Sequence, residues 1–137
     1  MNYWLIKSEP SVYPFHNLLN EKSTQWDGIR NFQARNNLAL MKTGDLCLYY
    51  HSNGERAVVG LAKVSAEAFP DPTATDPRWL AVRVAAVSEL QQPVSLSTIK
   101  QDPILQIMEL VRQSRLSVCP VRPEEFDRVI ELSGTQF

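Results

Sequence analysis

The sequence predicts an α+β domain, a mixed β-barrel with short helices around it. Two apolar stretches, at about 57–67 and 79–90, have the length and residue types of strands. In the first stretch apolar residues occupy both alternating faces, which is typical of a barrel strand. Asn53-Gly54 directly precedes it and favours a two-residue hairpin to a strand at about 45–52. Strands joined in this way predict antiparallel pairing.

The chain before this hairpin begins with a predicted strand, a helix and a turn. Residues 2–7 include Tyr, Trp and Ile, which favour a strand. Pro14 predicts the start of a short helix that ends near Asn20, because the fixed φ of proline suits the first helical position. Trp26-Asp27-Gly28 predicts a turn, since Asp bonds its own backbone and Gly accepts positive φ.

A second helix is predicted over about 31–41. Phe32, Leu38 and Met41 share one stripe at helical spacing, so they are expected to face the core. A lysine in the last turn and Gly44 at the C′ position should end this helix.

The C-terminal third of the chain predicts short helices and one strand. Serine favours the N-cap of a helix, proline its first position and glycine its C-terminal end. The expected elements are a helix begun by Ser95 or Ser97, a helix over about 103–108, a closing strand over 116–121, and a last helix that begins at Pro123 and ends before Gly134.

Composition indicates a single globular domain, 1–137. The chain has 137 residues, of which 44% are apolar, and no window approaches the ~18 apolar residues of a membrane span. We therefore expect a soluble intracellular protein, cytoplasmic or, in a eukaryote, nuclear, with no membrane partner. Cys47 and Cys119 lack C-x-x-C spacing, which favours buried free thiols. With only two histidines, neither a metal site nor a cofactor is indicated.

The charge distribution is less neutral than its total. A net charge of -1 and a pI near 6.1 argue against a protein that coats nucleic acid electrostatically, because such domains have a pI above ~9. Residues 22–42, however, contain Lys22, Arg30, Arg35 and Lys42 against a single acid, Asp27. If these cations share one face, they would give weak, salt-sensitive phosphate contacts; a scattered solvated surface is the alternative.

Polar and aromatic side chains concentrate between residues 25 and 52. A turn, a helix and a strand are predicted there, and their ends are expected to meet around a pocket. Aromatic faces beside amide and guanidinium donors suit a planar, hydrogen-bonding ligand such as a nucleobase. The candidate lining residues are Trp26, Arg30, Asn31, Gln33, Arg35, Asn36, Tyr50, His51 and Ser52.

The same segment carries a family resemblance. The long string Trp26-Asp27-Gly28-Ile29-Arg30-Asn31-Phe32-Gln33-Ala34-Arg35-Asn36 is highly specific, and shorter matches lie at Tyr3-Trp4-Leu5, Lys7-Ser8-Glu9-Pro10, Gly44-Asp45, Tyr50-His51-Ser52, Pro70-Asp71-Pro72 and Arg115-Leu116-Ser117-Val118. On these residues the chain resembles EVE domains, which are similar in fold to YTH and PUA domains. The resemblance implies a PUA-like mixed β-barrel with peripheral short helices that holds a modified base, 5-methylcytosine or a relative of it.

The function that this resemblance implies is a non-catalytic reader, a monomer whose partner is DNA or RNA that carries a modified base. The flipped base would stack on Trp26. The residues expected to bind it are Lys7, Ser8, Trp26, Arg30, Asn31, Tyr50, His51 and Ser52, while Arg35 and Lys42 are expected at flanking phosphates.

Each of these residues also has a structural interpretation. Trp26 would instead anchor the core, Ser8 and Asn31 would cap local backbone, and His51 would be a hydrogen-bonded strand histidine. Arg30 and Arg35 would form ion pairs, for example with Asp27 or Asp45. Tyr49 competes with Tyr50 for the face toward the pocket, because alternate strand residues point to opposite sides.

An enzyme is the second function that the sequence allows. Lys7 and Glu9 are two residues apart and would face one cavity, where burial lowers the pKa of a lysine enough for it to act as a base. The related ASCH domains include small amidohydrolases that act on acylated cytidine through a lysine and a glutamate; an ion pair is the structural alternative. Cys47 and His51 lie roughly 13 Å apart along one strand, which excludes a dyad. A protein-binding barrel with a vestigial pocket is the third possibility.

Overall fold

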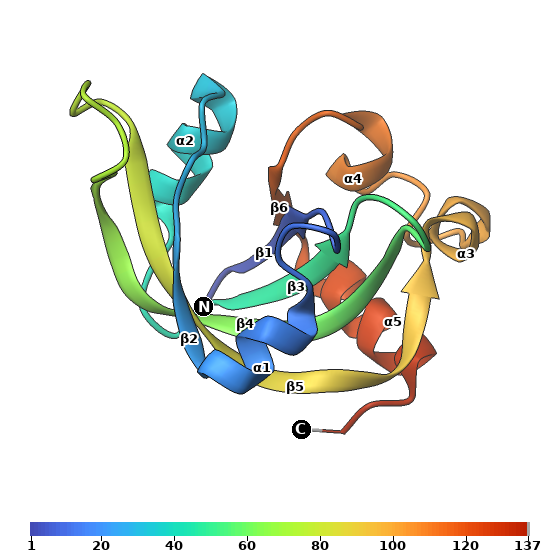
Figure 1. Ribbon diagram of the computed structural model, residues 1–137. Coiled ribbons are helices and arrows are strands. Elements are labelled where there is room, and N and C mark those ends of the chain that lie inside the picture. The colour runs from blue at the N-terminus through green and yellow to red at the C-terminus, as the bar shows by residue number, and fades with distance from the viewer. Residues whose placement is uncertain (137) are drawn as a thin grey trace.

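A six-stranded sheet forms the centre of the molecule (Figure 1). The structure is a computed structural model, and it describes residues 1–136. Across the sheet the strands follow the order β2-β5-β4-β3-β1-β6. Their bounds are β1 (Tyr3–Ser8), β2 (Ser23–Trp26), β3 (Leu46–His51), β4 (Ala57–Pro70), β5 (Leu80–Ser95) and β6 (Val118–Val121).

The sheet is mixed and open. β1 pairs parallel with β3, whereas the other neighbouring strands pair antiparallel. β2 and β6 are its two edges, so within residues 1–136 the strands do not close into a barrel. The predicted antiparallel pairing across the Asn53-Gly54 connection is present between β3 and β4, whereas the predicted closed barrel is not confirmed. A parallel pair needs a long crossover, and the segment 9–45 between β1 and β3 supplies one.

Short helices surround the sheet (Figure 1). Asn31 caps α2 by accepting a hydrogen bond from the Ala34 N–H at 2.9 Å, and Ser95 caps α3 in the same way. Pro123 opens α5 and Gly134, with φ +68°, ends it as predicted. The helices are α1 (Phe15–Glu21), α2 (Phe32–Leu40), α3 (Leu96–Gln101), α4 (Glu109–Arg112) and α5 (Pro123–Ser133).

Two details of α2 differ from the prediction. Leu38 is buried as expected, but Phe32 at the first helical position is 52% exposed. The helix ends at Leu40 with Met41 as its C-cap, so Gly44 does not occupy the C′ position and instead lies in the turn before β3 with φ +95°. The stripe drawn from spacing alone therefore overestimates how much of the first turn faces the core.

The predicted helix over 103–108 is a turn. The Asp102 carboxylate accepts hydrogen bonds from the backbone N–H groups of Ile104 at 2.9 Å and Leu105 at 3.2 Å. Such local side-chain bonds compete with the hydrogen bonds of a regular helix. The next helix, α4, consequently begins only at Glu109.

The strand β2 was not expected. Ser23–Trp26 has mostly polar residues and lacks the apolar alternation of a half-buried strand. It forms because it pairs antiparallel with β5, with Ser23 opposite Ala85 and Trp26 opposite Val82. A long-range pairing therefore places Trp26 at a strand end, next to the predicted turn at Gly28, where φ is +78°.

The connection between β3 and β4 is longer than a two-residue hairpin. β3 ends at His51 and β4 begins at Ala57, with Gly54 in the connection at φ +71°. Within β4, Gly60 marks a close approach, because a Cβ there would lie 2.5 Å from the ring of Phe15.

The core contains one buried carboxylate that organises the start of the chain. Asp45 is 3% exposed and accepts hydrogen bonds from Trp4 Nε1 at 3.0 Å and from the backbone of Asn2 and Lys42. Burial favours a raised pKa for Asp45, but these hydrogen bonds outweigh it, so the pKa lies below its usual value.

Cys47 and Cys119 are buried free thiols, as predicted. No helix between residues 1 and 136 has the length and apolar character to span a bilayer.

Candidate functional site

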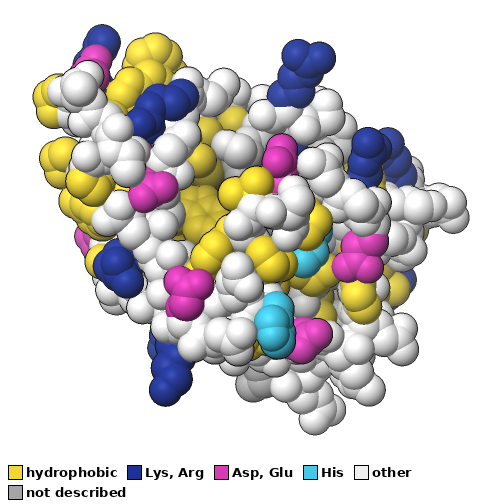
Figure 2. Space-filling view, viewed as in Figure 1, with side chains coloured by type: hydrophobic (Ala, Val, Ile, Leu, Met, Phe, Trp, Pro, Cys, Tyr) yellow, Lys and Arg dark blue, Asp and Glu magenta, His cyan; other side chains and the backbone are white. Residues whose placement is uncertain are grey.

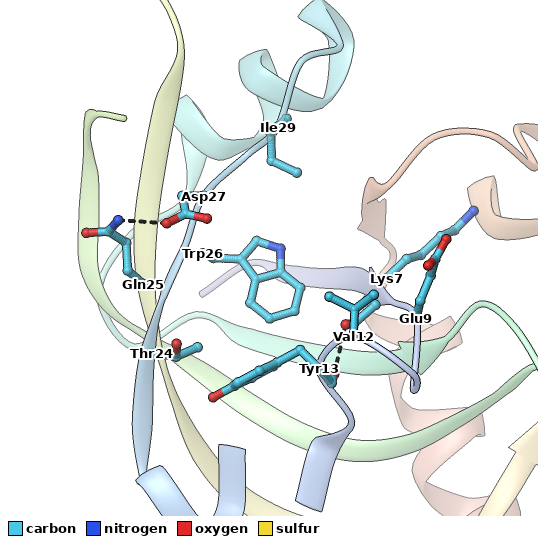
Figure 3. A pocket seen from close by; sticks show the side chains of 10 residues that line it. Lys7, Glu9, Val12, Tyr13, Thr24, Gln25, Trp26, Asp27 and Ile29 are labelled. Atoms are coloured by element: carbon cyan, nitrogen blue, oxygen red, sulfur yellow. Dashed lines mark hydrogen bonds between the residues drawn. The ribbon is translucent and has the colours of Figure 1, made fainter. Parts of the chain in front are cut away.

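A cavity of about 570 Å³ opens at the ends of β1 and β2 (Figure 3). This volume lies within the range typical of small-ligand pockets. The parallel pairing of β1 and β3 and the pairing of β2 with β5 bring its walls together from segments distant in the chain. The lining residues are Lys7, Ser8, Glu9, Val12, Tyr13, Thr24, Gln25, Trp26, Asp27 and Ile29.

The floor of the cavity is the indole ring of Trp26. The side chain packs edge to face against Tyr49, with ring centroids 5.5 Å apart, and against Tyr13 at 6.4 Å. Trp26 as a whole is only 8% exposed, yet it lines the cavity, and Figure 3 shows its ring between Ile29 on one side and Tyr13 on the other. Trp26 is therefore both a core anchor and a cavity surface.

Polar groups line the wall beside this ring. Ser8 Oγ donates to the carbonyl of Tyr13 at 2.8 Å, and the Tyr49 hydroxyl donates to the same oxygen at 2.6 Å, which fixes the segment between β1 and α1. On the opposite wall Gln25 Nε2 donates to the Asp27 carboxylate at 2.8 Å (Figure 3). Apolar Val12 and Ile29 complete the lining. Such a set offers an aromatic face, hydrogen-bonding edges and an apolar niche.

Lys7 lies at the mouth of the cavity. Its Nζ donates to the carbonyl oxygen of Ser114 at 2.9 Å and lies 6.0 Å from the centre of the Tyr50 ring. Burial lowers the pKa of Lys7, and the nearby Cys119 opposes that shift. Glu9 lines the same cavity, but within residues 1–136 it forms no ion pair with Lys7.

Asp71 holds the turn that forms one wall. Its buried carboxylate accepts hydrogen bonds from the Gly28 N–H at 2.8 Å, from Arg30 at 2.9 Å, and from the backbone and hydroxyl of Thr73 at 2.7 and 2.6 Å. Burial favours a raised pKa for Asp71, but these donors outweigh it and hold the pKa far below its usual value. The carboxylate thus keeps Asp27 and Ile29 in place.

Five of the predicted base-binding residues, Arg30 and the four described here, do not line this cavity. Asn31 caps α2, and Tyr50 is buried at 3% exposure. His51 Nε2 accepts a hydrogen bond from the Phe15 N–H at 3.1 Å, and burial lowers its pKa while the nearby Glu55 opposes the shift. The backbone N–H of Ser52 donates to the carbonyl of Ser8 at 3.0 Å. These residues position the cavity walls, and Tyr49 lies under Trp26 where Tyr50 was expected.

Comparison with known protein families matches residues 2–132 to the EVE domain. The chain belongs to the EVE domain family. It is 34% identical to thymocyte nuclear protein 1 of mouse, over 98% of this chain and 75% of the relative. The likeness to a named relative over nearly the whole chain agrees with the distribution of matching motifs along the sequence.

Solved structures of similar proteins share the fold of this EVE domain. A protein of Agrobacterium tumefaciens is 44% identical, with a TM-score of 0.94 over 98% of this chain and 94% of that one. The human THYN1 protein, solved in complex with DNA that contains 5-methylcytosine, is 32% identical, with a TM-score of 0.89 over the whole of both chains. A YTH domain of Zygosaccharomyces rouxii MRB1 protein, solved with N6-methyladenosine RNA, shares the fold alone, at 15% identity and a TM-score of 0.61 over 96% of this chain and 86% of that one.

The predicted cations of this EVE domain lie around the cavity, not inside it. Arg30 forms its ion pair with Asp71, not with Asp27 or Asp45. Arg35 donates to the carbonyl of Arg78 at 3.3 Å and to Asn36 at 2.6 Å, and Lys42 is exposed just beyond the C-terminal end of α2. Figure 2 shows a hollow with a hydrophobic floor and separate Lys or Arg side chains around it.

Sequence reasoning found four of the ten lining residues and missed the other six. Lys7, Ser8 and Trp26 were predicted to bind the base, and Glu9 was considered as a catalytic group; the structure brings all four to one cavity. The missed lining residues are Val12, Tyr13, Thr24, Gln25, Asp27 and Ile29. Asp27 and Ile29 lie within the family-matching string, which was a usable signal. Thr24 and Gln25 carried none because the β2–β5 pairing places them, and Val12 and Tyr13 carried none because hydrogen bonds to the Tyr13 carbonyl place their segment.

Among residues 1–136 no group of three or more His, Cys, Asp or Glu side chains is arranged to hold a metal ion. The cavity lining offers aromatic, hydroxyl, amide, carboxylate and ammonium groups. Such groups can stack on, hydrogen-bond to and neutralise a planar polar ligand.

Proposed function

We propose that this EVE domain is a reader that binds one modified nucleobase, 5-methylcytosine or a related base, of DNA or RNA. The observation that carries the proposal is the cavity whose floor is the Trp26 ring and whose walls are polar. The ligand class is supported by the human relative solved with DNA containing 5-methylcytosine, because both chains align over their whole length. The proposal is a binding function without catalysis.

The base would enter the cavity after leaving its stack, a step that costs a few kcal/mol. Stacking on Trp26 contributes roughly 1–3 kcal/mol. The Asp27 carboxylate, already ordered by Gln25, is placed to accept from an exocyclic amino group such as that of cytosine. Val12 and Ile29 offer apolar surface to a methyl group. One methyl contributes only ~1–3 kcal/mol, so discrimination by this cavity should be modest.

The remaining predicted residues receive supporting roles in this proposal. Lys7 and Ser8 border the cavity, where Lys7 supplies a cation at the mouth. Arg35 is assigned to a flanking phosphate, as is Lys42, just beyond the C-terminal end of α2. Asn31, Tyr50, His51 and Ser52 are assigned to holding the walls, because each is buried or hydrogen-bonded within the fold.

Titration with matched oligonucleotides tests the reader. We expect an oligonucleotide with one 5-methylcytosine or 5-hydroxymethylcytosine to bind about 5- to 150-fold more tightly than the unmodified sequence, which corresponds to the ~1–3 kcal/mol of one methyl. N6-methyladenine in the same position should not give this gain. Dissociation constants measured by fluorescence anisotropy, for single strands and duplexes at one salt concentration, provide the comparison. Equal affinity for all four oligonucleotides would contradict base reading.

A small amidohydrolase is the second candidate, because Lys7 and Glu9 line one cavity and burial lowers the pKa of Lys7. Against it, Nζ of Lys7 donates to the Ser114 carbonyl and does not pair with Glu9. The relatives described above also carry no catalytic name. We expect N4-acetylcytidine to remain unchanged when incubated with the protein and followed by chromatography. If the protein converts N4-acetylcytidine and Lys7→Ala abolishes this turnover, the amidohydrolase would replace the reader as the proposed function.

A further inference from the structure

A cluster of aromatic and arginine side chains lies on the surface beside the cavity. Phe32, at the start of α2, stacks on Trp79, in the connection between β4 and β5, with ring centroids 4.7 Å apart and planes inclined by 24°. Arg30 lies 5.7 Å from the centre of the Trp79 ring, while Arg35 and Arg78 lie 5.6 and 5.8 Å from that of Phe32. These five residues are called the arginine-aromatic cluster below.

The cluster holds three guanidinium groups in defined positions. Stacking on an aromatic face orders an arginine before any ligand arrives, and the N–H edges of the guanidinium stay available. Arg78 is largely exposed, and its partner Asp76 is also exposed. Arg35 has only neutral partners, the carbonyl of Arg78 and the side chain of Asn36, and its Nε is buried without a hydrogen bond.

A purely structural role explains only part of this cluster. The ring pair would hold the β4–β5 connection against α2, but Phe32 remains 52% exposed and buries too little apolar surface to be a core contact. Nor does that role need a third guanidinium that lacks a carboxylate partner. An exposed aromatic surface crowded with cations is instead typical of sites that bind nucleic-acid strands.

The position of the cluster continues the cavity. Ile29 lines the cavity wall, and Arg30 of the cluster directly follows it in the chain. Asp71 binds both the Gly28 N–H in the cavity wall and Arg30 in the cluster, so one carboxylate holds the two surfaces together. Figure 2 shows Lys or Arg side chains beside hydrophobic ones at the upper left, next to the hollow, where Figure 1 places α2 and the β4–β5 connection.

We propose that the arginine-aromatic cluster binds the sugar-phosphate backbone of the nucleotides that flank the base in the cavity. Arg35 and Arg78 contact phosphates, and the stacked rings keep both guanidinium groups oriented. This inference rests on the proposed function in that the ligand is a nucleic acid, but it assigns sequence-independent affinity to a surface separate from the cavity. Phosphate contacts position a strand and carry no base information, so the cluster should affect all oligonucleotides alike.

The test compares two double variants of equal charge. Arg35→Gln/Arg78→Gln removes two cations from the cluster, whereas Lys63→Gln/Lys100→Gln removes two exposed cations from β4 and α3 that line neither the cavity nor the cluster. Affinity for modified and unmodified oligonucleotides is measured from 50 to 300 mM salt. Each phosphate contact contributes about 0.9 to the slope of log affinity against log salt on duplex DNA and about 0.7 on single strands.

We expect the cluster variant to lower that slope by about 1.4–1.8 and to weaken binding about 10- to 30-fold at 0.15 M salt, equally for modified and unmodified DNA. The Lys63→Gln/Lys100→Gln control should change the slope by less than about 0.5. Arg35→Lys/Arg78→Lys, which keeps the charges, should restore most of the slope. An unchanged slope in the cluster variant, or an equal change in the control, would overturn the proposal.

The same measurements separate this proposal from the reader itself. A lowered salt slope in the cluster variant, without any preference for a modified base, would support phosphate binding by the cluster and contradict the reader function. A clear preference for a modified base, with an unchanged salt slope in the cluster variant, would support the reader function and contradict phosphate binding by the cluster. Thermal unfolding of each double variant shows whether a loss of affinity comes from unfolding, and a restored slope in the lysine variant excludes that explanation.

Discussion

Replacing Trp26 with alanine is expected to have the largest effect on both binding and stability. The side chain is 8% exposed and packs on Tyr49 and Tyr13, so its truncation should lower the free energy of unfolding by about 3–5 kcal/mol. Loss of stacking should weaken binding of the modified base by roughly 1–3 kcal/mol, or about 5- to 150-fold. Urea unfolding and anisotropy titrations measure the two effects separately.

A matched pair of milder variants separates the binding effect from instability. Trp26→Phe and Trp4→Phe each replace one buried indole with a smaller phenyl ring. Trp4 does not line the cavity, and its Nε1 instead donates to Asp45. We expect both variants to lose stability and only Trp26→Phe to lose affinity. Equal affinity of the two variants for the modified base would show that Trp26 does not contact the ligand, and it would favour a protein-binding domain whose cavity is vestigial.

Replacing Asp71 with alanine should have the second-largest effect. The substitution frees the Gly28 N–H and Thr73 and leaves Arg30, whose side chain is 40% exposed, without its carboxylate, so we expect a loss of about 1–3 kcal/mol in the free energy of unfolding. The cavity wall and the arginine-aromatic cluster would loosen together. Asp76→Ala, in the same connection, removes an exposed carboxylate paired with exposed Arg78 and should change stability far less.

The contribution of Asp71 should also appear in the pH dependence of stability. Its pKa is held below the usual value in the folded protein, while an unfolded aspartate titrates near pH ~3.9. A group with a depressed folded pKa contributes stability that is fully present above the unfolded pKa. That contribution is lost as the pH falls below about 4 toward the folded pKa. Between pH 7 and 2 the free energy of unfolding should fall more steeply with decreasing pH for the unmodified protein than for Asp71→Ala. Equal pH dependence of the two proteins would contradict this role.

The sequence located one side of the candidate site well and the other poorly. Trp26 was predicted from a family-matching string, and Lys7 and Ser8 from a short motif at the end of the first strand. Asn31, by contrast, was predicted as a base contact because its amide resembles a ligand group, and the structure uses that amide to cap α2. A side chain that satisfies the backbone nearby and one that faces a ligand have the same chemistry, so local sequence does not distinguish them.

The arginine-aromatic cluster shows the same limit for surfaces. Phe32 was predicted to face the core because of its helical spacing, yet it stacks on Trp79 from a connection more than forty residues away. Periodicity reports which residues share a helix face but not which face a neighbouring loop covers. The cation excess near Arg35 was visible in the sequence; the rings that orient it were not.

The sequence by itself determined the family, most strands and helices, the buried thiols and the presence of Trp26 in the cavity lining. It did so because strand and helix patterns, caps and a long specific string are properties of neighbouring residues. Only the tertiary structure decided the parallel pairing of β1 with β3, the existence of β2 and the identity of the cavity walls. Those features depend on hydrogen bonds and packing between segments far apart in the chain, and local sequence carries no record of them.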